Sequence, residues 1–123
     1  MTGNKYLADT NAFIYLLQKN PSVRSVLESE WAYSFITEIE LLGKPKIKEE
    51  EIKLVKQMLS VADKLLHVDS INEIAILLKQ KYSLKTPDAI IAATALYYKL
   101  PLLTADLDFV KIKDLNIILI ESN

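Results

Sequence analysis

The sequence predicts an α/β fold with a mainly parallel sheet of about five strands. Short segments rich in apolar and β-branched residues alternate with longer segments of helical periodicity, which is typical of βαβ units. Only two Gly and four Pro occur in 123 residues, so regular elements with few elaborate loops are expected. Half of the residues are hydrophobic, enough for one core, and no linker or repeat interrupts them. We therefore expect a single domain over residues 1–123.

The elements follow from local signals along the chain. The predicted strands cover residues 6–8, 31–36, 65–68, 102–103 and 117–120. The predicted helices cover residues 12–17, 22–27, a short stretch that ends near Gly43, 47–62, 74–78 and 89–98. Ser22 is expected to cap the second of these helices, and Asp69-Ser70 the helix over 74–78. Thr86 is expected to be the N-cap of the last helix, with Pro87 at its first position.

Two of the predicted helices differ in how their apolar residues are distributed. The helix over 47–62 is amphipathic, and its apolar side consists of Ile52, Val55, Met58, Leu59 and Ala62. That side either covers the sheet or offers a surface for self-association. The segment 89–98 is apolar nearly all round, which predicts a helix buried in the middle of the domain.

Charge and composition exclude several classes of protein. The formal net charge is −1, so contact with nucleic acid would depend on local patches or bound cations, not on a generally basic surface. The absence of Cys excludes disulfides, thiolate metal ligands and Cys nucleophiles. The N-terminal residues do not have the pattern of a signal peptide, and the longest apolar run, 89–98, is too short to cross a bilayer. We expect a cytoplasmic protein that does not enter membranes.

The most informative feature is the position of four acidic residues. Asp9 ends the first predicted strand, and Asp106 follows the fourth. Glu40 lies in the helix after the second strand, and Asp88 in the first turn of the apolar helix. Ligand sites of parallel α/β sheets lie outside the carboxyl ends of the strands. Asp9, Glu40 and Asp106 lie in segments that follow strands at that edge. Asp88 lies near them if its helix begins at the same edge.

Converging carboxylates repel one another, and a divalent cation relieves the repulsion. Mg²⁺ and Mn²⁺ prefer hard oxygen ligands, can activate a water molecule, and stabilise charge on a phosphodiester. Each acid also has an ordinary structural interpretation. Asp9 and Asp106 would cap helices, Asp88 would favour a helix N-terminus, and Glu40 would be solvated.

These same residues lie in four segments that resemble the motifs of PIN domains. The segments are Leu7-Ala8-Asp9-Thr10-Asn11-Ala12-Phe13-Ile14, Phe35-Ile36-Thr37-Glu38-Ile39-Glu40-Leu41-Leu42-Gly43, Asp88-Ala89-Ile90-Ile91-Ala92-Ala93-Thr94-Ala95 and Leu103-Thr104-Ala105-Asp106-Leu107-Asp108-Phe109. Their order, their intervals and the total length agree with the family. The resemblance covers essentially the whole chain.

The resemblance implies a three-layer α/β/α fold and a Mg²⁺- or Mn²⁺-dependent ribonuclease. Small prokaryotic members are commonly VapC-type toxins that cut RNA until an antitoxin protein blocks the site, and they commonly form homodimers. By position, the catalytic and metal-binding residues would be Asp9, Glu40, Asp88 and Asp106. The supporting residues would be Thr10, Asn11, Thr104 and Asp108.

Some positions leave a choice open. Many toxin members carry a basic residue where this chain has Ala105, so one phosphate contact is missing. Glu38 competes with Glu40 for the second motif; we prefer Glu40 because Leu-Leu-Gly follows it in register, and two residues apart on a helix the side chains diverge. Lysines near the predicted site either form a solvated surface or contact RNA phosphates. These lysines are Lys44, Lys46 and Lys85.

Two other functions are compatible with the pattern. The first is a PIN-like module that binds RNA or protein without catalysis, although four mutually repelling acids would then have no purpose. The second is a phosphatase that uses Asp9 as a nucleophile. Such enzymes usually have a second Asp two residues later, and this chain has Asn11 there.

Overall fold

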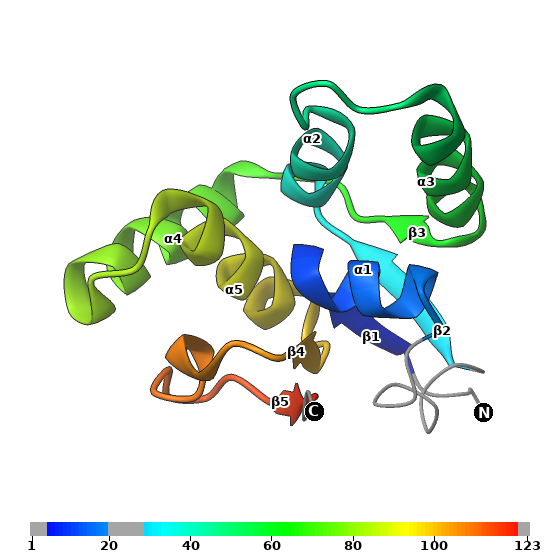
Figure 1. Ribbon diagram of the computed structural model, residues 1–123. Helices are drawn as coiled ribbons and strands as arrows, with labels where there is room; N and C mark the ends of the chain where they lie inside the picture. Colours follow the sequence, from blue (N-terminus) through cyan, green and yellow to red (C-terminus); the bar gives the residue numbers. More distant parts are fainter. Residues whose placement is uncertain (1–4, 20–28, 121–123) are drawn as a thin grey trace.

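The computed structural model describes residues 5–19 and 29–120 (Figure 1). The helix predicted over 22–27 lies outside these residues. The strands are β1 (Lys5–Ala8), β2 (Glu30–Tyr33), β3 (Asp63–Lys64), β4 (Leu102–Thr104) and β5 (Ile117–Leu119). The helices are α1 (Thr10–Leu17), α2 (Phe35–Leu42), α3 (Glu49–Val61), α4 (Asp69–Tyr82), α5 (Thr86–Tyr98) and the short 3-10 helix η2 (Leu107–Phe109).

The five strands form one parallel sheet in the order β3-β2-β1-β4-β5. The predicted α/β class and parallel sheet are confirmed. From β1 the chain passes through α1 to β2 on one side, whereas β4 pairs with β1 on the other side. The strand order therefore reverses between β1 and β4, where parallel sheets commonly bind ligands.

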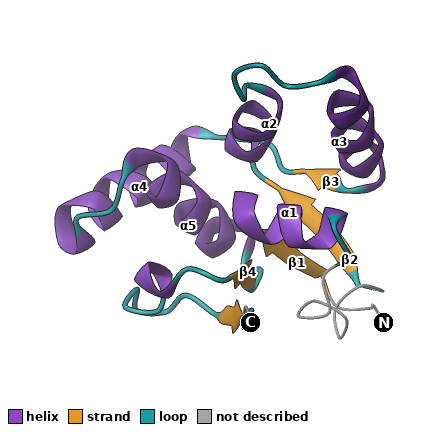
Figure 2. Cartoon of the chain, viewed as in Figure 1, coloured by secondary structure: helices purple, strands orange, loops and turns teal. Residues whose placement is uncertain are grey.

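Side chains of the central strands alternate between two hydrophobic clusters, one on each face of the sheet. Leu7 and Leu102 pack with α4 and α5, whereas Ala8 and Leu103 pack with α1 and α3. Figure 2 shows α4 and α5 side by side on one side of the strands and α3 on the other. This is the three-layer α/β/α arrangement that the family resemblance implied.

The two helices singled out in the sequence have the burial that their composition predicts. Along α5, six of the residues from Ala89 to Ala95 are buried, and Ile90 is the exception. On α3, Val55 and Leu59 are buried in the cluster on the α1 face. The apolar side of α3 therefore covers the sheet. No helix in the described part of the chain is long and apolar enough to span a membrane.

The second and third predicted strands are partly wrong. The second was expected over 31–36 but ends at Tyr33, because the Ser34 side chain accepts a hydrogen bond from the Ile36 N–H at 3.1 Å and begins α2. The third was expected over 65–68, yet β3 is Asp63–Lys64. It is an edge strand with both residues exposed, so it lacks the apolar pattern of a buried strand.

Two predicted helix caps are displaced. Asp69 lies in the first turn of α4, and Val68 occupies the N-cap position without a side-chain hydrogen bond. Likewise, Lys85 is the N-cap residue of α5, so Thr86 and Pro87 are its first two helical residues. Pro in the first turn remains favourable because its missing N–H would have no helical partner there.

Candidate active site

The register of β1 against β4 brings two segments of the chain into contact where both strands end. Ala8 pairs with Leu103, and the Asp9 N–H donates to the Leu103 carbonyl at 3.1 Å. Asp9 consequently lies beside Thr104, 95 residues later in the chain. Because both strands point the same way, the residues that follow them emerge at one edge of the sheet.

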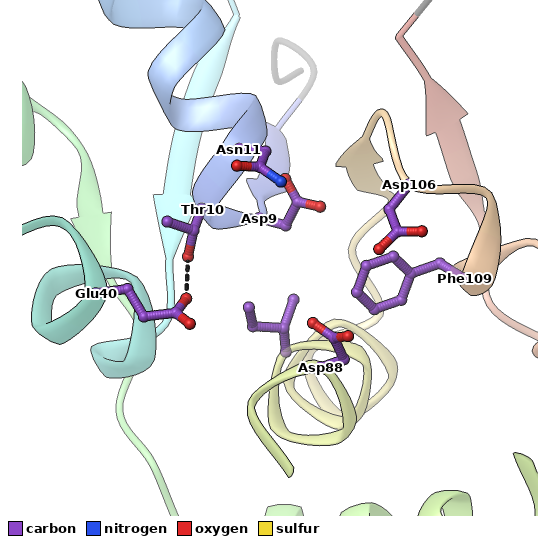
Figure 3. Close-up of a pocket in the computed structure, with 8 residues that line it drawn as sticks. Asp9, Thr10, Asn11, Glu40, Asp88, Asp106 and Phe109 are labelled. Atoms are coloured by element: carbon purple, nitrogen blue, oxygen red, sulfur yellow. Dashed lines mark hydrogen bonds between the residues drawn. The ribbon is translucent and has the colours of Figure 1, made fainter. Parts of the chain in front are cut away.

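A pocket of about 190 Å³ lies at this edge (Figure 3). Its lining residues are Asp9, Thr10, Asn11, Glu40, Asp88, Ile91, Asp106 and Phe109. The four predicted acids thus come from four separate segments: the ends of β1 and β4, and helices α2 and α5. Figure 3 shows the side chains of Asp9, Asp88 and Asp106 around the same cavity, with Glu40 across from Asp106.

Asp9 is only 5% exposed, and hydrogen bonds hold both of its carboxylate oxygens. The Ala12 N–H donates to Oδ1 at 2.7 Å, so Asp9 caps α1. The Thr104 hydroxyl donates to Oδ2. The capping interpretation of Asp9 is therefore correct, and the same side chain also lines the pocket.

Thr104 connects the two strand ends. Its hydroxyl donates to Asp9 and accepts a hydrogen bond from the Asp106 N–H at 2.9 Å. Asp106 in turn accepts from the Asp108 N–H at 2.9 Å and caps η2. Asp108 itself is exposed and does not line the pocket. Of the polar residues expected to support the site, Thr104 is the one whose hydroxyl joins the segments that follow β1 and β4.

Glu40 is held by a hydroxyl from another helix. The Thr10 hydroxyl donates to Glu40 Oε1 at 2.5 Å, and this bond links the first turn of α1 to α2 (Figure 3). Glu38 forms an ion pair with Lys64 at 2.9 Å and does not line the pocket. The structure thus places Glu40, and not Glu38, beside the other acids.

Burial and the charges of neighbouring acids make two carboxyl groups of the pocket, those of Asp9 and Asp88, harder to ionise. Loss of hydration is the main reason that the pKa of Asp9 is raised above its ordinary value, and the charges of Asp106 and Asp88 add to it. The hydrogen bonds from Thr104 and Ala12 act in the opposite direction. The pKa of Asp88 is also raised, first by burial and then by Asp106 and Glu40. Among residues 5–19 and 29–120, no cationic side chain lines the pocket.

The donor atoms of the pocket suit a hard divalent cation. Carboxylate oxygens dominate, with hydroxyl and amide oxygens from Thr10 and Asn11 beside them. A cation would lower the raised pKa values, because it favours the ionised carboxylates. Within residues 5–19 and 29–120, the acids surround the pocket without three of them being close enough to hold one ion.

The predicted lysine contacts lie in different places. Lys44 forms an ion pair with Glu51 at 3.2 Å. Lys46 is exposed between α2 and α3 and does not line the pocket. Lys85 precedes α5, and its charge opposes the rise in the pKa of Asp88. Lys85 is therefore the one of the three that acts on the acidic pocket electrostatically.

Two apolar lining residues were not singled out in the sequence. Ile91 lies three residues after Asp88 on α5, and Phe109 lies three residues after Asp106. Residues three apart share one side of a helix, so this spacing was a usable signal. Both side chains form an apolar wall beside the carboxylates.

The chain is similar to known proteins in sequence and in structure. The PIN domain family model matches residues 6–115. A chain of a toxin–antitoxin complex from Klebsiella pneumoniae is 32% identical, with a TM-score of 0.77 over 92% of this chain and 95% of that chain. VapBC-1 from nontypeable Haemophilus influenzae gives 26% identity and a TM-score of 0.76 over 94% and 97%. DNA-bound VapBC from Salmonella typhimurium gives 23% and 0.81 over 94% and 97%. The search of curated proteins found no match.

Thr104→Val should destabilise the protein by about 2–3 kcal/mol, because a buried carboxylate loses its hydroxyl partner and the Asp106 N–H loses its acceptor. Thr104→Ser keeps the hydroxyl and loses one methyl group, at about 0.8 kcal/mol. Urea unfolding of the three proteins measures this order. A larger loss for Ser than for Val would show that packing, and not the hydroxyl, stabilises this position.

Asp88→Asn should make the metal-free protein more stable near neutral pH. The pKa of Asp88 in the folded protein is raised above its ordinary value of 3.8. Below pH 3.8 the carboxyl is therefore protonated in the folded and the unfolded protein alike, and it does not lower the free energy of unfolding. As pH rises through the folded-state pKa, the folded protein must ionise a group that the unfolded chain has already ionised, and the free energy of unfolding falls. Urea unfolding in EDTA between about pH 4 and 8 should show a shallower fall for the variant. Parallel curves would contradict the assignment.

Proposed function

Because the chain belongs to the PIN domain family, we propose that it is a metal-dependent endoribonuclease that hydrolyses RNA phosphodiester bonds. The observation that carries the proposal is the pocket itself. Carboxylates from four separate segments line one cavity at the carboxyl edge of a parallel sheet. Two of these carboxyl groups have a raised pKa, which is a common property of functional sites.

Asp9, Glu40, Asp88 and Asp106 would hold one or two Mg²⁺ or Mn²⁺ ions. Each ion would be bound by one or two carboxylates and several water molecules, because no three acids among the described residues are close enough to share one ion. The ion supplies a Lewis acid that activates water and stabilises the charge developing on the phosphodiester. The donor set supports this assignment because it is rich in oxygen, and the described residues that line the pocket include no cation. Neither His nor Cys lines the pocket, so the hard ions Mg²⁺ and Mn²⁺ suit it better than Zn²⁺.

The side chains of the protein position these charges. Thr104 holds the buried Asp9 carboxylate, and Thr10 holds Glu40. Asp88 and Asp106 lie on the other side of the pocket, beside the apolar wall of Ile91 and Phe109. During hydrolysis a water oxygen bonds to phosphorus and loses a proton, the bond between phosphorus and a sugar oxygen breaks, and the sugar oxygen gains a proton. Asn11, which lines the pocket, and Asp108, whose charge acts on Asp88, would support these acids.

We further propose that the protein is the toxin of a type II toxin–antitoxin module. The Klebsiella pneumoniae relative is a component of a toxin–antitoxin complex and aligns over nearly the full length of both chains. The partner would be a small antitoxin that blocks cleavage, and the protein would act in the cytoplasm, where its RNA substrate lies. Self-association as a homodimer belongs to the same proposal and is measured by light scattering of the purified protein. Lys85, close to the acidic pocket, is the lysine best placed to contact RNA phosphates.

Asp9→Asn should lower the rate of RNA cleavage by more than about 100-fold, because even groups that only support metal ligands typically contribute 10- to 100-fold. Cleavage by the wild type should stop in EDTA and return with Mg²⁺ or Mn²⁺. Glu73→Gln, an exposed acid on α4, is the matched control and should cleave at the wild-type rate. Cleavage by Asp9→Asn at the wild-type rate in the presence of metal would show that Asp9 is not a catalytic residue. No cleavage by the wild type under any metal condition would favour a non-catalytic binding module.

Expression of the wild type in a bacterial host should arrest growth, whereas expression of Asp88→Asn should not, because the variant lacks one of the carboxylates of the pocket. The variant should still fold, because the substitution relieves repulsion between the acids. The measurement is the growth curve after induction, together with immunoblots that show equal amounts of both proteins. Equal growth arrest by both proteins would mean that toxicity does not come from the acidic pocket.

A further inference from the structure

Thr37 is a fully buried polar residue next to the site, and no function described above uses its side chain. It is 0% exposed, and it lies in the first turn of α2, three residues before Glu40. Within the described residues its hydroxyl has one hydrogen-bond partner, the Thr10 hydroxyl, at 3.2 Å. That same Thr10 hydroxyl holds Glu40 at 2.5 Å. Thr37 therefore contacts the group that anchors a pocket acid.

The hydroxyl of Thr37 is not used to stabilise its own helix. A buried threonine in a helix commonly bonds the carbonyl four residues earlier, as Thr94 does with the Ile90 carbonyl at 2.7 Å. Thr37 lies too early in α2 for this bond, because the residue four positions earlier, Tyr33, belongs to β2. Its hydroxyl is instead directed across to α1.

The direction of the hydrogen bonds follows from the chemistry of the three groups. A Thr hydroxyl has one hydrogen, and an ionised Glu carboxylate can only accept. Thr10 must therefore donate to Glu40, and its lone pair is left to accept from Thr37. The hydroxyl hydrogens rotate freely, so this order is available at the observed distances. Donation from Thr37 polarises the Thr10 hydroxyl and strengthens its bond to Glu40.

We propose that Thr37 is a positioning residue for the metal-binding carboxylate of Glu40 and acts on it through Thr10. The inference rests on the proposed metal-dependent function. Glu40 is exposed and has a long side chain with several rotamers, and within the described residues Thr10 is its one hydrogen-bond partner. The Thr37 hydroxyl fixes Thr10 against α2, so the anchor and the acid keep a constant separation.

A pair of substitutions separates this role from simple packing. Thr37→Val keeps the shape of the side chain and removes the hydroxyl, whereas Thr37→Ser keeps the hydroxyl and removes a methyl group. A positioning role requires that Val impairs the site and that Ser preserves it. A packing role requires the opposite order. Thr37→Ala, compared with Thr37→Ser, isolates the hydroxyl again if the Val variant does not fold.

The primary measurement is the affinity of the purified protein for Mn²⁺ in the absence of RNA, determined by titration calorimetry. We expect Thr37→Val to bind Mn²⁺ about tenfold more weakly than the wild type, at the lower end of the effect of groups that support metal ligands. Thr37→Ser should bind within about twofold of the wild type, because its hydroxyl remains. Thr94→Val, which removes a buried threonine hydroxyl elsewhere, is the matched control and should leave the affinity unchanged.

A double-substitution cycle tests whether the effect passes through Glu40. In a Glu40→Gln background, Thr37→Val should cause no further loss of Mn²⁺ affinity, because the carboxylate that it positions is gone. An equal tenfold loss in both backgrounds would overturn the proposal, as would wild-type affinity in Thr37→Val. Failure of the wild type to bind Mn²⁺ would reject the proposed metal-dependent function itself, and the role of Thr37 with it. These outcomes distinguish the two proposals.

Discussion

The parallel pairing of β1 with β4 is the constraint on which the pocket depends. It places the ends of two strands side by side, although 95 residues separate Asp9 from Thr104 in the chain. One hydroxyl then bonds the carboxylate that follows β1 and the backbone that leads to Asp106. A shift of one residue in this register would direct Thr104 to the other face of the sheet and separate these groups.

Two of the acids cap a helix and also line the pocket. Asp9 caps α1 with one oxygen, and its carboxyl group also lines the pocket. Asp106 caps η2 and lies across the pocket from α2. A cap fixes the position of a carboxylate relative to a rigid helix. The raised pKa of Asp9 shows that burial at this place opposes ionisation even so.

The parallel sheet was predicted because short apolar segments alternate with segments of helical periodicity. Carboxyl ends of parallel strands share an edge, so Asp9 and Asp106, which follow β1 and β4, were expected to converge there. This rule does not place Asp88, whose helix follows another helix, and the family resemblance grouped it with the other acids. Local rules were less reliable where hydrogen bonds compete. The second strand was expected to continue to residue 36, but the Ser34 cap ended it, and β3 has two exposed residues that no apolar pattern could indicate.

The exact partners of side chains between elements could not be read from the sequence, although the family resemblance indicated Thr10 and Thr104 as supporting residues. The bond between Thr10 and Thr37 depends on how α1 packs against α2, and both residues are unremarkable in composition. Lys44 was expected either on a solvated surface or in contact with RNA phosphates, and it forms an ion pair with Glu51 on α3. Such partners are set by three-dimensional distance, which periodicity along the chain does not contain. Ile91 and Phe109 differ, because their spacing from the acids was visible.

The order of the strands in the chain also determines when the pocket can exist during synthesis. A ribosome releases β1, α1, β2 and α2 early, and with them Asp9 and Glu40. The strand that pairs with β1 on its other side, and the acid that follows it, emerge only after residue 101. A nascent chain that stops earlier has neither Thr104 to hold Asp9 nor Asp106 to face it. The fold thus delays assembly of the acidic pocket until β4 and Asp106 have been translated, after the other three acids.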